Sequence, residues 1–323
     1  MRTERTPIAE SARLGHLYAL DLLDGPADER FDRITRVASR ALRIPIALVS
    51  LVDADRQWFC STQGIDAAET PRGDAFCSHA IAGQAPMMVV ENALDDPRFA
   101  ENPLVQGDPH IRFYAGAPIA SPGGPLIGTL CIIDSEPRKL LRADAQVLRD
   151  LADLVEREVL FTGLALTDAL TGLANRRAFT AAADRLVPLA ARRYEPVSVL
   201  CFDVDGLKCV NDEYGHDVGD ELLRRAARAI SRSVRSSDLI ARVGGDEFYA
   251  VLYGASENAA SEVVAKIYDA VAADNARRPA DPALSISIGS ACAATGESTE
   301  NVIRRADASM YRMKRELARR RTA

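Results

Sequence analysis

The 323-residue sequence lacks the patterns that mark secreted, membrane-spanning or zinc-stabilised proteins. Its six cysteines form no C-x-x-C pair and have no histidine at ligand spacing, which argues against a structural zinc site or a disulfide framework. The longest apolar run, residues 44–52, is interrupted by Pro45 and Ser50 and is far shorter than the ~20 residues of a membrane span. Residues 1–10 are polar and charged, unlike a signal peptide. These absences predict a cytoplasmic protein without a membrane partner.

Clustered positive charge is scarce as well. The chain has 40 lysine and arginine residues against 46 aspartate and glutamate residues, which gives a net charge of −6. Nucleic-acid binding needs lysine and arginine gathered on one surface, so we expect no nucleic-acid partner. The 47% hydrophobic and 27% charged residues are typical of a soluble globular protein. The length suggests about two domains of ~150 residues each.

The first half, which we assign to residues 1–140, predicts an α+β domain. Apolar side chains recur at helical spacing in residues 10–24 and again in residues 31–42. Helices in front of hairpin-linked strands, with one long loop over the sheet, indicate an antiparallel sheet. The expected strands are residues 46–52, 57–62, 87–90, 112–120 and 126–134, with a short helix at 75–81 and an irregular segment at 92–110.

Several blocks of the first half, taken in order, resemble a GAF domain. These blocks are Pro45–Asp53, Arg56–Phe59, Glu69–Arg72, Ala75–Ile81, Phe113–Pro118 and Gly128–Asp134. The resemblance implies a sensory module of bacterial signalling with a small-molecule ligand of unknown identity. Cys77 and His79 suggest either a haem or redox site, or a buried structural cysteine beside a hydrogen-bonded histidine. We favour the structural interpretation for both residues.

Residues 141–166 predict a long amphipathic helix between the two halves. Leu148, Leu151, Val155 and Val159 recur along one side, with charged residues between them. Such a helix can close the first domain. Its length and its position before a second set of motifs favour a linker that also pairs with its copy in a homodimer.

The second half, residues 167–323, is organised around the stretch Arg242–Phe248. Apolar runs meet there at Gly244 and Gly245, which predicts a tight β-hairpin because adjacent glycines supply the positive φ of a two-residue turn. Asp246 and Glu247 come directly after the glycines. Adjacent strand residues point to opposite faces of a sheet, so we expect these two acids to have different roles.

Five blocks of the second half, in order, resemble a GGDEF domain, the catalytic domain of diguanylate cyclases. They are D-x-L-T-G-L-x-N-R-R from Asp168, F-D-x-D with a downstream N-D and G-H-x-x-G-D, R-x-G-G-D-E-F, Ser287–Gly289, and Ala306-Asp307 with Tyr311 and Lys314. The resemblance implies a ferredoxin-like palm, related to nucleotidyl cyclases and polymerases. It also implies condensation of two GTP into cyclic di-GMP and two pyrophosphates. Each site holds one GTP, so the active form is expected to be a homodimer that the GAF domain regulates.

The chemistry of this reaction makes separate demands on the acids. Attack of a ribose 3′-hydroxyl on an α-phosphate needs charge neutralisation, which two divalent ions held by carboxylates supply. We place Asp203 and Asp246 on Mg²⁺, with Mn²⁺ as an alternative, and the family pattern adds the Val204 carbonyl. Glu247 is then free to act on the attacking hydroxyl, as its base or as an orienting acceptor. The predicted catalytic residues are thus Asp203, Asp246 and Glu247.

The resemblance also assigns the substrate contacts. Asn211 and Asp220 match positions that contact guanine, and a carboxylate can accept from guanine N1–H and N2–H together, whereas adenine offers no such pair. Lys208 and Lys314 match positions that neutralise the β- and γ-phosphates. His216 fits either a contact near the base or ribose, or a cap on the following helix. The remaining predicted contacts are Gly206, Leu207 in place of the usual aromatic, and Gly244 and Gly245, which leave room for a phosphate-bearing ligand.

Arg235 and Asp238 form an R-x-x-D pattern upstream of the signature, at the spacing of the family's product-inhibition site. We infer allosteric feedback by cyclic di-GMP there, because an arginine can bind a guanine edge or a phosphate bidentately. Asp168 is expected to form a structural ion pair with Arg176 or Arg177. The alternative function is a non-catalytic receptor for GTP or cyclic di-GMP that signals through protein contacts, against which the intact acids argue.

Overall fold

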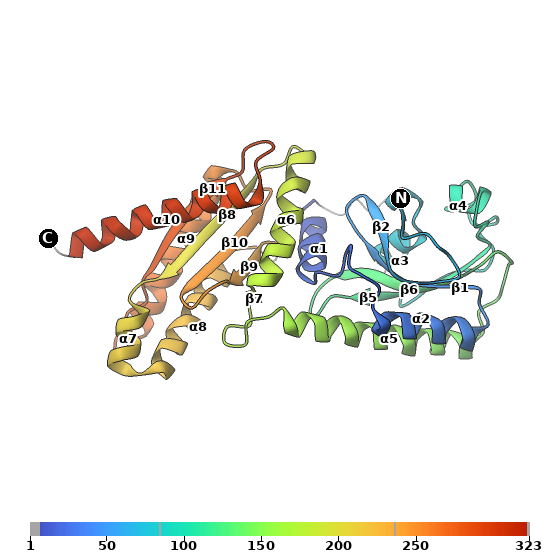
Figure 1. Cartoon of the computed structure of the whole chain (residues 1–323), viewed down its shortest axis with the longest axis horizontal. Coiled ribbons are helices and arrows are strands. Elements are labelled where there is room, and N and C mark those ends of the chain that lie inside the picture. The colour runs from blue at the N-terminus through green and yellow to red at the C-terminus, as the bar shows by residue number, and fades with distance from the viewer. Residues whose placement is uncertain (1–6, 84, 236, 322–323) are drawn as a thin grey trace. The chain divides into compact units, whose positions relative to one another are not determined.

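The structure is a computed structural model that describes residues 7–83, 85–235 and 237–321. It divides into two compact units (Figure 1). Of the described residues, those from 20 to 165 form one unit, and those from 166 to 321 form the other together with residues 7–19. The helix α1 (Pro7–Ala19) therefore packs with the second half of the chain, on α6 (Arg176–Arg192), although the sequence analysis assigned it to the first domain.

The first unit is built on a six-stranded antiparallel sheet of order β3-β2-β1-β6-β5-β4. Helices α2 (Glu29–Leu42) and α5 (Arg142–Ala165) pack side by side on one face, and α3 (Phe76–Ala82) covers the other. The long loop contains α4 (Pro103–Gln106), and a 3-10 turn, Arg72–Asp74, precedes α3. The strands are β1 (Ile46–Val52), β2 (Arg56–Gln63), β3 (Glu69–Pro71), β4 (Met88–Val90), β5 (Phe113–Ala120) and β6 (Leu126–Asp134).

The second unit is a five-stranded sheet of order β11-β8-β10-β9-β7, in which only the β7–β9 pair is parallel. Helices α8 (His216–Ser233) and α9 (Glu257–Arg277) cover one face, whereas α6 and α10 (Thr299–Arg321) cover the other. The short α7 (Leu207–Tyr214) follows β8 directly. The strands are β7 (Ala174–Asn175), β8 (Val197–Val204), β9 (Leu239–Arg242), β10 (Glu247–Tyr253) and β11 (Ile286–Cys292). The predicted α+β fold is confirmed in both halves.

Strand alternation explains which side chains of β8 enter the core and which face the other helices. Leu200, Phe202 and Val204 pack under α8 and α9 with residues such as Leu223 and Ile267. The alternate residues, which include Asp203, face α6 and α10 because successive strand side chains point to opposite faces. This alternation places a carboxylate beside α10. Within the described residues, no helix has both the length and the apolar character needed to cross a bilayer.

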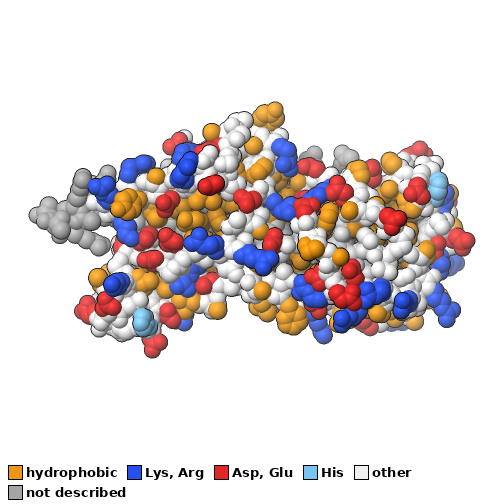
Figure 2. Space-filling view, in the orientation of Figure 1, with side chains coloured by type: hydrophobic (Ala, Val, Ile, Leu, Met, Phe, Trp, Pro, Cys, Tyr) orange, Lys and Arg blue, Asp and Glu red, His pale blue; other side chains and the backbone are white. Residues whose placement is uncertain are grey.

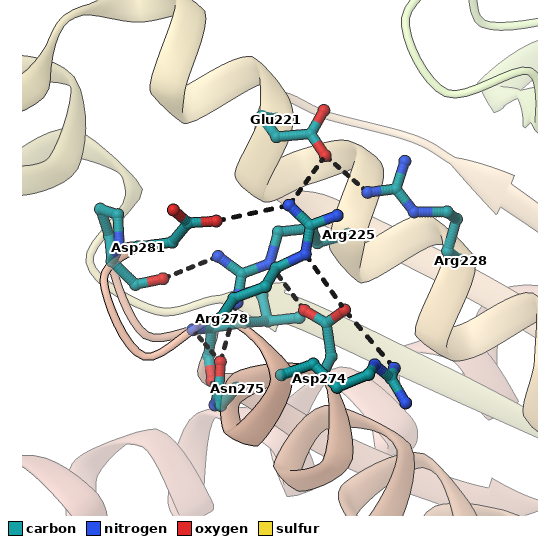
Figure 3. A network of polar contacts seen from close by, with 10 residues as sticks. Glu221, Arg225, Arg228, Asp274, Asn275, Arg278 and Asp281 are labelled. Atoms are coloured by element: carbon teal, nitrogen blue, oxygen red, sulfur yellow. Dashed lines mark hydrogen bonds and ion pairs between the residues drawn. The ribbon is translucent and has the colours of Figure 1, made fainter.

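A buried arginine joins α8 to the end of α9 (Figure 3). Arg225 is only 2% exposed, and its Nε donates to Asp274 Oδ2 at 2.7 Å. Its two terminal nitrogens donate to Asn275 Oδ1 (2.9 Å) and to the Pro282 carbonyl (2.8 Å). Asn275 in turn bonds both main-chain groups of Leu284. The guanidinium thus fixes the loop that leads from α9 into β11.

We expect Arg225→Met to lower the free energy of unfolding by about 3 kcal/mol, because it leaves a partly buried carboxylate without its nearest cation. Urea denaturation would measure this change. The control Arg228→Met removes an exposed ion pair with Glu221 and should cost less than about 1 kcal/mol. Equal losses for the two variants would contradict the assigned role of Arg225.

Because Arg225 pairs with Asp274, the stability that Arg225→Met loses should depend on pH. Burial alone raises the pKa of Asp274, but the hydrogen bond from Arg225 and the charges of Arg278 and Arg277 outweigh it and hold the pKa below its usual value. A carboxyl pKa lowered by folding stabilises the folded state above the unfolded-state pKa of ~3.9, and this contribution is lost as the pH falls through the folded-state pKa. The difference between wild type and Arg225→Met should therefore shrink below about pH 4.

Candidate active site

Three carboxylates meet at one end of the second sheet. Asp203 lies near the end of β8 and is only 8% exposed. The strand register sets Glu247, the first residue of β10, opposite Asp203, so both side chains lie on the same face. Asp246 lies in the preceding turn, and its main-chain oxygen accepts a hydrogen bond from the Val204 N–H at 3.0 Å. Figure 2 shows acidic side chains grouped over this end of β8, below α10.

The signature forms the predicted hairpin, but the turn is not the predicted two-residue turn. Val243 and Gly244 both donate main-chain hydrogen bonds to the Glu247 carbonyl, and Asp246 lies within the turn instead of after it. Neither Gly244 nor Gly245 has a positive φ. A β-carbon at position 244 would lie 2.5 Å from Glu247 Oε2, whereas one at 245 meets nothing within 4 Å. Gly244 therefore leaves room for the Glu247 side chain, which folds back against the turn.

Two arginines hold this turn, and sequence reasoning missed the role of both. Arg242 donates to the Gly245 carbonyl through Nη2 (2.8 Å) and to the Asp168 carboxylate through Nη1 (3.3 Å). Arg176 donates to the Val243 carbonyl at 2.7 Å and lies 3.7 Å from Glu247 Oε2. Asp168 was expected to pair with Arg176 or Arg177. It instead accepts from Arg242, the arginine that opens the R-x-G-G-D-E-F signature.

Lys314 reaches the carboxylates from α10. Its Nζ lies 2.7 Å from Asp203 Oδ1. Burial raises the pKa of Asp203, Lys314 opposes this, and the charges of Asp246 and Asp205 add to the rise. Burial would lower the pKa of Lys314, but Asp203, Asp205 and Asp246 raise it above its usual value. The site therefore holds more negative than positive charge, and Lys314 neutralises only part of it.

Asp205 is the second acid of the F-D-x-D motif, and its environment differs from that of Asp203, the first acid. Ser285, just before β11, and Ser287, on β11, each donate to one of its carboxylate oxygens at 2.7 Å. Asp205 therefore anchors β8 to β11, and Asp203 and Asp246 are the acids available to a ligand. In the part of the chain that the structure describes, no group of three or more His, Cys, Asp or Glu side chains is placed to hold a metal. Two carboxylates suit Mg²⁺, which takes its other ligands from phosphate, water or a carbonyl.

The predicted base-binding residues come together where α7 meets α8. A β-carbon at Gly219 would overlap Asn211 Oδ1, so the Asn211 amide occupies the space beside α8, next to Asp220. Leu207 packs partly against the core, whereas Lys208 and His216 are exposed. Gly206 begins α7 with φ +73°, which favours glycine. Gly215, and not His216, is the N-cap of α8, so the alternative role of His216 as a helix cap is wrong.

The R-x-x-D segment forms a turn beside α1. The Arg235 N–H donates to Asp238 Oδ2 at 2.9 Å, and burial raises the pKa of Asp238. Ser237 is buried, and a β-carbon on Gly15 of α1 would lie 3.8 Å from its carbonyl oxygen. The Arg235 side chain is exposed. The remaining residue of the pattern, Ser236, lies outside the described residues.

Comparison with known proteins follows the same division of the chain. Residues 165–320 match the family described as diguanylate cyclase, GGDEF domain, and residues 26–159 match the GAF domain. A protein of Pseudomonas aeruginosa named cyclic di-GMP phosphodiesterase is 43% identical over 178 residues, 54% of this chain and 30% of that protein. The diguanylate cyclase DosC of Escherichia coli is 40% identical over 171 residues, 52% of this chain and 36% of that protein.

The solved GGDEF domain of DgcB from Caulobacter crescentus, in complex with cyclic di-GMP, is 33% identical with a TM-score of 0.44, over 47% of this chain and 89% of that one. This chain spans about a third of the length of the curated relatives named above. Both resemblances inferred from the sequence blocks are confirmed. The chain therefore carries a GAF domain over residues 26–159 followed by a GGDEF domain of the diguanylate cyclase family over residues 165–320.

Proposed function

We propose that the chain is a diguanylate cyclase that condenses two GTP into cyclic di-GMP and two pyrophosphates. The observation that carries the proposal is the meeting of Asp203, Asp246 and Glu247 on one sheet end, with Lys314 in contact. Asp203 and Asp246, with the Val204 carbonyl, are the residues that would hold Mg²⁺ or Mn²⁺. The bound cation would neutralise the phosphate charge that develops during the transfer.

The protein's own groups divide the remaining work. Glu247 lies beside Asp203 and accepts the proton, or a hydrogen bond, of the attacking 3′-hydroxyl. Arg176 and Arg242 hold the turn carbonyls, so they fix where Asp246 and Glu247 stand. Lys208 and Lys314 supply positive charge for the β- and γ-phosphates.

Base selection rests on the pair at the α7–α8 junction. The Asn211 amide lies against Gly219 of α8, and Asp220 is the next residue of that helix. A carboxylate accepts from two guanine N–H groups at once, so this pair supports GTP over ATP as the substrate. We also assign Arg235 and Asp238 to feedback by the product, at the turn beside α1.

Incubation of the full chain with GTP and Mg²⁺ tests the proposal. We expect cyclic di-GMP and pyrophosphate in a ratio of one to two, detected by mass spectrometry, and no product after chelation with EDTA. Absence of product at every protein concentration, with GTP binding intact, would favour the receptor function instead. Hydrolysis of added cyclic di-GMP would favour the activity named for the P. aeruginosa relative, of which this chain spans 30%.

A second apolar face on α5 supports a homodimer. One face of the helix is buried against the sheet through residues such as Leu148 and Val155. Val147, Leu154 and Phe161 are exposed and recur every seven residues, the spacing of a coiled-coil seam. Figure 2 shows hydrophobic side chains gathered at the end of α5 that carries residue 161. Pairing of two α5 helices would bring two GTP-loaded domains into one molecule.

We expect the double variant Leu154→Glu/Phe161→Glu to be monomeric at low micromolar concentration and to lose most cyclase activity, because charged side chains disfavour the seam. Sedimentation equilibrium and initial rates measure the two effects. Leu94→Glu is the matched control, because Leu94 is 44% exposed and Leu154 43% exposed, but Leu94 lies outside α5. A dimer that survives the double substitution would contradict pairing through α5.

A further inference from the structure

The GAF domain contains a cavity of about 450 Å³ that is lined by residues of its sheet and of helix α3. Its walls are mostly apolar, whereas Asp66 and Asp108 stand at positions exposed to solvent. Carboxylates at those positions disfavour an anionic occupant. The apolar wall includes Ile46, Leu48, Phe59, Phe76, Ile111 and Ile133.

Two polar atoms of the cavity lining have no hydrogen-bond partner in the described part of the chain. They are Gln57 Oε1 and Thr70 Oγ1, and both atoms are buried. Gln57 as a whole is only 5% exposed. A buried acceptor without a donor is costly, so an occupant that brings an O–H or N–H group would be favoured here. The cavity is thus suited to a neutral, mainly apolar molecule with a hydrogen-bond donor.

A cysteine in the same lining is surrounded by hydroxyl groups. Ser50 Oγ, Thr129 Oγ1 and Tyr114 Oη lie 3.0, 2.9 and 3.3 Å from Cys77 Sγ, in position to donate to it. Burial alone would raise the pKa of Cys77, but its contacts with Cys131 and the three hydroxyls together lower it to about 7. Donors on three sides stabilise a thiolate, which is the nucleophilic form of cysteine. A purely structural role for Cys77 does not explain why three hydroxyl groups surround its sulfur.

A second thiol lies within reach of the first. Cys131 Sγ on β6 is 3.8 Å from Cys77 Sγ, and Cys131 is fully buried. The hydrogen bond with Cys77, and then burial, raise the pKa of Cys131 well above its usual value. The pair therefore combines a sulfur that three hydroxyl groups surround with a neighbouring thiol whose pKa is raised. His79, which the sequence placed beside Cys77, packs edge-on against Phe99 instead.

We propose that this cavity is an oxidation site for small organic hydroperoxides, with Cys77 as the nucleophile and Cys131 as the thiol that closes a disulfide. Cys77 sulfur attacks the terminal oxygen, the O–O bond breaks, and the alkoxide takes a proton and leaves as an alcohol. Cys77 is oxidised to a sulfenic acid while the hydroperoxide is reduced by two electrons. Cys131 sulfur then attacks Cys77, which yields the disulfide and one water. The O–H of the hydroperoxide supplies the donor that Gln57 and Thr70 lack.

The test treats the reduced full chain with cumene hydroperoxide and follows each cysteine by peptide mass spectrometry. We expect a Cys77–Cys131 disulfide in the wild type. Cys131→Ser should stop at a Cys77 sulfenic acid that dimedone traps. Ser50→Ala and Thr129→Val should each slow the reaction by about tenfold, because each removes one donor to the thiolate. Cys201, which is buried and whose pKa is raised by burial, is the internal control and should stay reduced.

A double variant separates the ligand site from the thiol. Gln57→Leu/Thr70→Val should slow oxidation by cumene hydroperoxide several-fold, because it removes both acceptors for the O–H group and leaves the hydroxyls around Cys77 in place. Oxidation of Cys201 as fast as Cys77, or an unchanged rate in both Ser50→Ala and Thr129→Val, would overturn the proposal. Hydrogen peroxide that reacts as fast as cumene hydroperoxide at equal concentration would overturn the assignment to organic hydroperoxides. None of these readouts depends on cyclase activity.

Discussion

Replacement of Gly289 by valine is expected to destabilise the GGDEF domain by about 3 kcal/mol or more and to abolish cyclase activity. A β-carbon at this position would overlap the main-chain N of Met310 and the main-chain O of Ala306, both in α10. Main-chain atoms of a helix cannot rotate away as a flexible side chain can. The whole helix must therefore lift from β11, which carries Gly289.

The loss of activity follows from the position of Lys314 on the same helix. Ala306, Met310 and Lys314 are spaced four residues apart, so they lie along one face of α10. Lifting this face at residues 306 and 310 withdraws the Lys314 ammonium from Asp203, which it now contacts at 2.7 Å. Stability and catalysis should thus fail together.

Chemical denaturation and initial rates measure the two effects of Gly289→Val. Gly245→Ala is the matched control for stability, since a β-carbon there meets nothing within 4 Å. Its free energy of unfolding should stay within about 0.5 kcal/mol of the wild type. A Gly289→Val protein with the wild-type denaturation midpoint would contradict the close packing of α10 on β11.

Asp246→Asn is expected to lower the cyclase rate by about 100-fold or more while the domain stays folded. The substitution keeps the shape of the side chain and removes one of the two negative charges that would hold the divalent cation. The main-chain bond from Val204 to the Asp246 carbonyl is unaffected, so the turn keeps its position. The rate of cyclic di-GMP formation at saturating GTP and Mg²⁺ measures the effect.

Two further variants sharpen this result. Glu247→Gln should cause a loss of similar size, with cation affinity unchanged, because Glu247 is assigned to the hydroxyl. Asp212→Asn, at an exposed acid of α7, should leave the rate unchanged. An Asp246→Asn protein with wild-type turnover would remove Asp246 from the site and with it the proposed cation site.

The sequence predicted where the acids lie better than it predicted the turn and the residues that hold them in place. The mainly apolar run of residues 197–202, which ends at Asp203, predicts a buried strand, and the glycines before Asp246 predict a hairpin. The prediction of the turn's conformation was wrong, because paired glycines are typical of positive φ, whereas Gly244 has no positive φ and leaves room for the Glu247 side chain. A contact of this kind has no local sequence signature.

The sequence also did not predict which residues far apart in the chain contact each other. Arg242 binds Asp168 across 74 residues, and nothing in the pattern distinguishes it from Arg176 as a partner. The hydroxyls around Cys77 come from three different strands, so they become neighbours only when the sheet forms. Helix α1 was assigned to the adjacent domain because its apolar periodicity does not show which surface it will cover.

The ion pair between Lys314 and Asp203 links the affinities of two ligands. Without a cation the lysine balances part of the charge of the acids, so a divalent ion has to compete with it for Asp203. Nucleotide phosphates offer Lys314 another partner and so weaken that competition. Each ligand then lowers the free-energy cost of binding the other, and linkage makes the effect equal in both directions. The cation and GTP are therefore expected to bind this domain cooperatively, because both change the contact between Lys314 and Asp203.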